Sequence, residues 1–266
     1  MPPSASLARA KSRQTARSRP LVAGDYLAES RAPLASLVFL LPMIILYEIG
    51  TLVFARDALT GAETRIIAFN LLNDFLAMFG ATGRYLPALA VVSILLWWHI
   101  ARRDPWGVRP QTMGLMAVES VCWAVPLMAV AYLMASYVPL TALVAGGGVG
   151  GSEASLAAMI VLSLAAGIYE ELVFRLIAFA VLSFVLSDVL GVKPRTAVVI
   201  TLLVSSVGFS LYHYLGWEQP HWQTFVFRTV AGFFFGALYL SRGFGVTAGS
   251  HAAYDVIVHC LRFTAF

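Results

Sequence analysis

The chain has 266 residues, of which 59% are hydrophobic and only 12% are charged, and its mean hydropathy is +0.80. This composition excludes a soluble globular domain and predicts a polytopic membrane protein. We assign the net charge of +4 to basic cytoplasmic loops and not to nucleic-acid binding. Period-two alternation is missing, so we expect an all-α transmembrane bundle and not a β-barrel.

The first 32 residues are basic and rich in Arg, Pro, Ser and Ala, and they precede the first apolar run. Their length and polarity argue against a signal peptide. We predict that this segment is a disordered tail on the cytoplasmic side, where it can touch anionic lipid.

Apolar runs that approach the length of a bilayer-spanning helix, about 20 residues, recur along the rest of the chain. Residues 66–79 are shorter and contain Asn70, Asn73 and Asp74, so we expect an interfacial or partly inserted helix there. The seven predicted spans are 34–54, 85–100, 114–137, 153–190, 196–214, 224–240 and 246–263.

The side on which the basic residues lie follows from this assignment. If 66–79 does not cross the membrane, Arg102, Arg103 and Arg109 lie on the same side as the N-terminal tail, as the positive-inside rule favours. The chain then divides into the tail, 1–32, a first group of transmembrane helices, 33–150, and a region that carries the candidate chemistry, 151–266.

A glycine-rich loop at 144–151 precedes the fourth predicted span. No Lys follows its glycines, so it is not a phosphate-binding loop. Ser152 is expected to cap the next helix. As one helix the stretch to Leu190 would be about 55 Å long, more than a bilayer needs, and we expect it to bend or divide soon after Arg175. Gly232-xxx-Gly236 predicts close helix packing.

A charged motif, Glu170-Glu171-xxx-Arg175, lies inside the fourth span. A charge at that depth costs roughly a few kcal/mol on insertion scales, so it needs a partner or a function. On a helix, Glu171 and Arg175 are four residues apart with the acid first, which favours an ion pair. Glu170 lies about 100° away around the helix, so its carboxylate remains available for chemistry.

Two histidine motifs lie on later apolar segments, Phe209-xxx-His213 and His251-xxx-Asp255. Helical spacing places the Phe209 ring beside His213, and it places His251 and Asp255 on one face. A carboxylate and an imidazole that converge on one water form a general base. A second histidine can donate a hydrogen bond to the oxyanion of a tetrahedral intermediate. Peptide hydrolysis needs these parts.

The three motifs, taken in this order, resemble those of the CPBP family of glutamic-type intramembrane endopeptidases, which includes the type II CAAX prenyl proteases and the abortive-infection and bacteriocin-processing proteins. The resemblance covers about residues 155–260. It implies a membrane-associated protein or peptide as substrate, no nucleic acid, no cofactor, and a bacterial cell membrane with a cytoplasmic N-terminus. The implied roles are water activation by Glu170 and His213, an oxyanion hole from His251 and Asp255, and support from Glu171, Arg175 and Phe209.

One position departs from the family pattern, since prenyl proteases typically carry Asn where this chain has Asp255. An ionised carboxylate only accepts hydrogen bonds. Asp255 therefore either orients His251, is protonated, or bridges His251 and His259. The departure bears directly on whether the substrate is prenylated.

Three other interpretations use the same residues. Glu170, His213 and His251 could bind zinc and leave a position for water, although the chain has no HExxH motif. A membrane immunity or scaffold protein could keep the pocket without the activity. A proton-coupled transporter would also bury Glu and His, but no inverted repeat is evident.

A simple zigzag of the spans places the two histidines at opposite faces of the membrane. His213 ends a span, whereas His251 begins one. We therefore predict that residues 243–249 run extended into the bundle, where a wet or protein-lined cavity allows irregular backbone. His251 should then lie within about 12 Å of Glu170, close enough to share a substrate.

Overall fold

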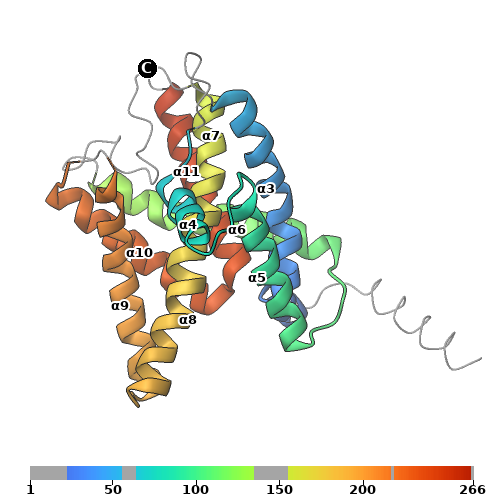
Figure 1. The fold of residues 1–266 in the computed structure, drawn as a ribbon. Coiled ribbons are helices and arrows are strands. Elements are labelled where there is room, and N and C mark those ends of the chain that lie inside the picture. Colours follow the sequence, from blue (N-terminus) through green and yellow to red (C-terminus); the bar gives the residue numbers. More distant parts are fainter. Residues whose placement is uncertain (1–22, 56–63, 135–154, 217–218, 265–266) are drawn as a thin grey trace, which may run out of the picture.

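The computed structural model describes residues 23–55, 64–134, 155–216 and 219–264, and every regular element in these ranges is helical (Figure 1). Within these ranges, five helices are long and apolar enough to cross a membrane: Pro33–Phe54 (α3), Pro110–Met134 (α6), Leu156–Val189, Pro194–Leu215 and Trp222–Arg242 (α10). The predicted all-α membrane bundle is confirmed.

The remaining predicted helices also form, with shorter or less apolar sequences. Residues predicted as the second span form α5, Leu86–Arg102, which has 17 residues. The predicted interfacial helix is α4, Ile67–Ala77, with 11 residues. The last predicted span is α11, Phe244–Thr264, with 21 residues.

The N-terminal segment is more ordered than predicted. Residues 1–22 lie outside the described part of the chain, but Ala23–Ser30 form a helix, α2, where disorder was expected. The backbone N–H of Arg109 donates to the carboxylate of Glu29 at 2.6 Å, and the Arg109 guanidinium pairs with Asp25 at 3.6 Å. The end of the predicted tail therefore lies beside the loop between α5 and α6, in agreement with the predicted topology.

The start of the fourth span also differs from the prediction. The glycine-rich loop and Ser152 lie outside the described residues. The helix cap is Ser155, whose hydroxyl oxygen accepts from the backbone N–H of Ala158 at 3.2 Å. A serine at this position satisfies one of the first-turn amides, which have no partner within the helix.

Of the predicted bend or division after Arg175, the division is wrong, because the chain stays helical from Leu156 to Val189. Its hydrogen-bond pattern changes instead to the wider π form. The successive segments are Leu156–Ala165 (α7), the π-helical Ala166–Glu170 (η2) and Leu172–Ile177 (η3), Ala178–Ser183 (α8) and the π-helical Phe184–Val189 (η4). A π turn absorbs an extra residue without leaving backbone groups unpaired, which an apolar interior would penalise. The first two π segments contain Glu170 and Arg175 of the charged motif, and Glu171 lies between them.

The prediction of an extended segment at 243–249 is also wrong. The chain reverses at Gly243, whose φ of 82° is open to glycine, and α11 begins at the next residue. The α11 backbone is buried from its first turn, with Val246 and Ala248 0% exposed. A helix pairs its own backbone groups, so it is less costly than extended chain in this interior.

His213 and His251 lie at the same depth in the bundle because α9 (Pro194–Tyr212) and α11 begin at different depths. Figure 1 shows that the hairpin of α8 and α9 projects beyond the start of α11. The start of α11 lies instead beside α3, where the backbone N–H of Gly245 donates to the hydroxyl of Ser36 at 3.1 Å. His213 therefore follows a full 19-residue helix, whereas His251 lies in the second turn of α11.

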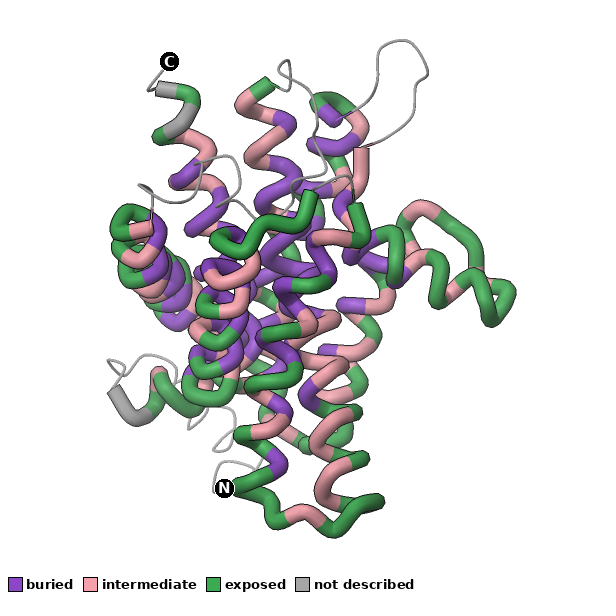
Figure 2. Tube along the Cα trace, turned by 90° about the vertical axis from the view of Figure 1, so that its left-hand side faces the viewer, coloured by how far each residue is buried: buried purple, intermediate pink, exposed green. Residues whose placement is uncertain are grey.

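Buried residues gather in the middle of the molecule (Figure 2), and one buried cluster joins α3, α7, η2 and α11. Glycines allow a second close contact between helices, as the Gly232-xxx-Gly236 motif in α10 predicts. A Cβ built on Gly232 would lie 3.0 Å from the Cα of Ser206, and one on Gly236 would strike Leu202. The motif thus packs α10 against α9, and that prediction is confirmed.

Among the described glycines, Gly167 makes the closest contact to the backbone of another helix, between η2 and α11, and this contact gives a first testable prediction. A Cβ on Gly167 would lie 2.5 Å from the carbonyl oxygen of Ala248 and 2.7 Å from the amide nitrogen of Ala252. Because backbone atoms cannot move aside cheaply, we expect Gly167→Ala to lower the free energy of unfolding by about 1–3 kcal/mol. Unfolding in detergent micelles measures the effect.

Gly114 is the matched control, because nothing lies within 4 Å of its added Cβ. Gly114→Ala should leave the protein as stable or stabilise it by about 0.5–1 kcal/mol, since glycine weakens a helix interior. Equal stability of the two variants would contradict the close contact at Gly167.

Candidate active site

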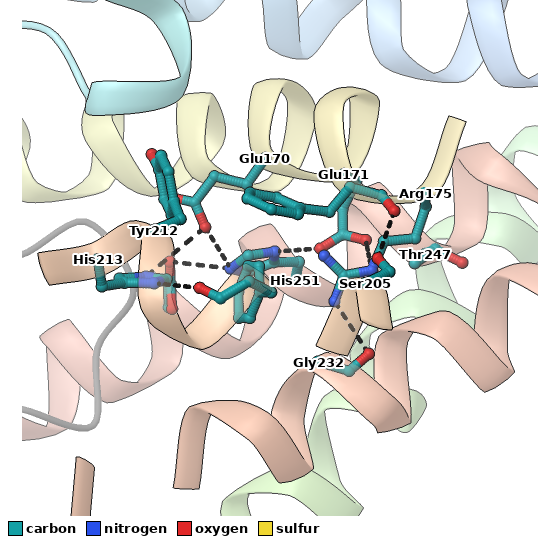
Figure 3. Close-up of polar contacts among 12 residues, drawn as sticks. Glu170, Glu171, Arg175, Ser205, Tyr212, His213, Gly232, Thr247 and His251 are labelled. Atoms are coloured by element: carbon teal, nitrogen blue, oxygen red, sulfur yellow. Dashed lines mark hydrogen bonds and ion pairs between the residues drawn. The ribbon is translucent and has the colours of Figure 1, made fainter. Parts of the chain in front are cut away.

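The three residues predicted to share a site lie together on three different helical segments (Figure 3). Glu170 closes η2, His213 follows α9, and His251 lies in α11; their residues are 0%, 4% and 1% exposed. The Nε2 atoms of His213 and His251 are 3.9 Å and 3.8 Å from the same oxygen, Oε2 of Glu170. The predicted proximity of His251 and Glu170 is confirmed.

The predicted pair of Glu171 and Arg175 is also present. The guanidinium Nε of Arg175 is 3.0 Å from Oε2 of Glu171, and both side chains are fully buried. Arg175 further donates to the carbonyl of Gly232 on α10 at 3.1 Å. Its guanidinium lies over the ring of Phe209, 4.5 Å from the centroid. The arginine therefore ties three helices together as well as neutralising Glu171.

His213 is oriented by its own helix. Its Nδ1 is 2.8 Å from the carbonyl oxygen of Phe209. A carbonyl only accepts, so Nδ1 carries the hydrogen, and Nε2 of the neutral ring is an acceptor that faces Glu170. The Phe209 ring contacts the imidazole edge to face, with centroids 5.0 Å apart, as the spacing of the motif predicts.

His251 is oriented from the neighbouring helix. Its Nδ1 is 2.7 Å from Oε1 of Glu171, so Nδ1–H donates to that carboxylate. Its Nε2 faces Glu170 and also lies 3.7 Å from Oδ2 of Asp255, one turn further along α11. Glu171 therefore joins Arg175 on one side to His251 on the other. His259 has a different neighbour, since its Nδ1 lies 3.0 Å from the hydroxyl of Ser163.

Two site residues were missed by the sequence analysis. Tyr212 donates from its phenol to Oε1 of Glu170 at 3.3 Å. Phe235 stacks on the imidazole of His251, with centroids 4.6 Å apart. Phe235 lies within the Gly232-xxx-Gly236 motif, which was interpreted only as a packing device. Neither residue carries a spacing signal of its own toward Glu170 or His251, because both contacts join separate helices.

A small pocket borders His251 on the side of α6 and α10. One cationic side chain, Arg228, lines it together with apolar and aromatic groups. The lining residues are Leu127, Phe209, Phe227, Arg228, Ala231, Phe235, His251 and Tyr254. The pocket thus places apolar walls and a positive charge beside the histidine.

The zinc interpretation requires the side chains of Glu170, His213 and His251 to direct their ligand atoms at one point. Within the described residues, no group of three or more His, Cys, Asp or Glu is placed to hold a metal ion. Both histidines use Nδ1 for a protein partner, so only the two Nε2 atoms face Glu170. This orientation of the two rings suits a hydrogen-bonded cluster, and it is also the orientation in which histidines bind a metal through Nε2.

The fold and the site define a polytopic helical membrane protein with a buried Glu–His–His cluster. Comparison with known families gives the more particular assignment: residues 152–257 match the family model described as Type II CAAX prenyl endopeptidase Rce1-like. All three motifs lie inside the matched range, and the resemblance to the CPBP family is confirmed for this region. The match supports membrane CAAX protease activity. No curated protein and no solved structure matches the chain.

Proposed function

We propose that the protein is an intramembrane endopeptidase that hydrolyses a peptide bond with a water molecule activated by Glu170 and His213. One observation carries the proposal: two imidazoles from separate helices turn Nε2 toward a single buried oxygen of Glu170. Neither Oε2 of Glu170 nor Nε2 of His213 hydrogen-bonds within the described residues. Buried polar atoms normally have partners, so these two are suited to bind water and substrate.

Water activation follows from the orientation of the two acceptors. Oε2 of Glu170 and Nε2 of His213 are 3.9 Å apart, a separation at which one water can donate a hydrogen bond to each. The water oxygen then attacks the carbonyl carbon of the peptide bond while one of its protons passes to the base. When the C–N bond breaks, the same group returns the proton to the leaving nitrogen.

Stabilisation of the oxyanion falls to His251 in this proposal. Because Nδ1–H donates to Glu171, a donor toward the substrate must come from Nε2, which requires the imidazolium form. The nearby carboxyl groups of Glu171 and Asp255 balance that positive charge. Asp255 then orients His251 and need not contact the oxyanion itself.

The substrate and the setting are extensions of the same proposal. The buried position of Glu170 favours a membrane-associated protein or peptide as the substrate, and the CAAX-type family match agrees with that class. We place the N-terminus in the cytoplasm, because α2 contacts Arg109 after α5 and the sequence that precedes α2 is basic. The family match suggests a bacterial cell membrane as the setting.

A comparison of membrane proteomes tests the activity directly. Cells that express the wild-type protein and cells that express Glu170→Gln are compared for peptide bonds that are cut only in the wild type. We expect at least one cleaved membrane protein, and the corresponding peptide then serves as substrate for the purified enzyme. Identical peptide termini in both cell types would instead favour the immunity or scaffold interpretation.

The zinc alternative uses the same three side chains, because both Nε2 atoms face Glu170. It predicts about one zinc ion per purified chain and loss of cleavage after chelation. The metal-free mechanism predicts that cleavage persists under a chelator. Inactivation by chelation that added zinc reverses would contradict the metal-free mechanism.

A further inference from the structure

The phenol of Tyr212 lies between the first turn of α4 and the carboxylate of Glu170. The amide nitrogen of Ala68 is 2.6 Å from the phenol oxygen, and that oxygen is 3.3 Å from Oε1 of Glu170. An amide N–H only donates, so the phenol accepts from Ala68 and directs its single proton to Glu170. The three groups therefore form a hydrogen-bond chain in which each proton points toward Glu170, from the Ala68 amide to the phenol and from the phenol to the carboxylate.

The ring of Tyr212 has little freedom to leave this position. Its residue is only 5% exposed, and its ring contacts those of Phe174 and His213 edge to face, with centroids 5.2 Å and 5.0 Å apart. The Ala68 amide belongs to the first turn of α4, where amides lack a partner within the helix. The positive end of the α4 dipole also favours donation by the phenol toward a carboxylate.

Helix α4 is in turn fixed against the segment that carries Glu170. Phe69, next to Ala68, makes edge-to-face contacts with Tyr169 and Tyr47, at centroid distances of 5.2 Å and 5.9 Å. Tyr169 directly precedes Glu170 in η2. The donor for Tyr212 and the backbone of Glu170 are therefore held by one aromatic cluster.

We propose that Tyr212, held by α4, is a positioning residue for Glu170. The inference rests on the proposed function, because it takes Glu170 as the base that activates water. One oxygen of the Glu170 carboxylate binds the phenol, and the other binds the water. Oε1 receives the phenol, which leaves Oε2, the oxygen that faces both imidazoles, for the water. Without the phenol the carboxylate rotates about its Cγ–Cδ bond, and the base no longer has a fixed direction. Tyr212 transfers no proton in this scheme.

Steady-state kinetics test the role on the peptide identified by the proteome comparison. Tyr212→Phe removes only the phenol oxygen. A hydrogen bond to a charged group accounts for roughly a 10- to 150-fold effect, so we expect kcat to fall within that range while KM changes less than about threefold. The matched control is Tyr239→Phe, a partly buried tyrosine on α10 whose ring contacts Phe179. It should leave kcat unchanged.

Substitution of Tyr212 by 4-aminophenylalanine separates positioning from anchoring of α4. Its amino group still donates to Glu170 but is a poor acceptor for the Ala68 amide. Recovery of kcat to within about fivefold of the wild type supports positioning. If the amino variant is no more active than Tyr212→Phe, the positioning role of Tyr212 is overturned. The role is also overturned if Tyr212→Phe itself has a normal kcat. If Tyr212→Phe does not fold, the amino variant alone decides, and a low kcat for the folded amino variant overturns the proposal.

Infrared spectroscopy gives a readout that does not need catalysis. The carboxyl band that disappears in Glu170→Gln belongs to Glu170. That band should shift in Tyr212→Phe and stay in place in Tyr239→Phe, and an unshifted band overturns the proposal. If Glu170→Gln cleaves peptide normally, the proposed function fails, yet the infrared comparison still tests the contact between Tyr212 and Glu170.

Discussion

Replacing Glu170 by Gln should reduce peptide cleavage by the purified enzyme by on the order of 10²- to 10⁴-fold, the usual contribution of a general base. Gln has nearly the same shape, but its amide is a very weak base. It also presents NH₂ donors to the two imidazoles, which lie 3.8 Å and 3.9 Å from the carboxylate. Turnover of the identified peptide in lipid nanodiscs measures the loss, and thermal unfolding checks that the variant is folded.

The matched control for this substitution is Asp74→Asn, which makes the same chemical change at an exposed position on α4. Its turnover should stay within about twofold of the wild type, because the side chain lies outside the buried cluster. A folded Glu170→Gln enzyme within tenfold of wild-type turnover would show that another group activates the water.

The largest loss of stability should follow Arg175→Met, which we expect to lower the free energy of unfolding by about 3–5 kcal/mol. The reason is that a buried ion pair that loses one partner leaves an uncompensated charge in the interior. Glu171 would keep its contact with His251 but lose the guanidinium at 3.0 Å. Gly232 would lose a donor to its carbonyl oxygen as well. Equilibrium unfolding in mixed micelles is the measurement.

Two further variants make this result specific to the buried pair. Arg102→Met removes an arginine from an ion pair near the surface, with Asp104 at 2.8 Å, and should cost about 1 kcal/mol or less. Glu171→Gln combined with Arg175→Met should be more stable than Arg175→Met alone, because the unpaired charge is gone. If Arg175→Met were no more harmful than Arg102→Met, the buried pair would contribute little to the fold.

Local spacing was enough to predict the contacts made within one helix. Glu171 and Arg175 pair because residues four apart share a helix face, and Phe209 contacts His213 for the same reason. That geometry also identified Glu170 as the carboxylate that Arg175 does not satisfy. These predictions succeeded because they need only a helical backbone, which an apolar run in a membrane forms almost of necessity.

The predictions that failed were those that required the depth of one helix relative to another. If all spans had equal depth, His251 could reach Glu170 only with residues 243–249 unwound. The hairpin of α8 and α9 instead projects beyond the start of α11 (Figure 1), so a regular helix suffices. The π segments that contain Glu170 and Arg175 were not predicted either, and the first of them packs against α11 at Gly167.

The sequence by itself determined the membrane class, the helical spans, the charged pair and the three residues from which a peptidase site can be built. Tertiary structure alone decided that both imidazoles face one oxygen of Glu170, that Glu171 joins Arg175 to His251, and that Tyr212 holds the other oxygen. The physical reason is range: helix periodicity acts over one turn, whereas these contacts between helices join residues 42 to 81 positions apart in the chain and depend on how whole helices pack.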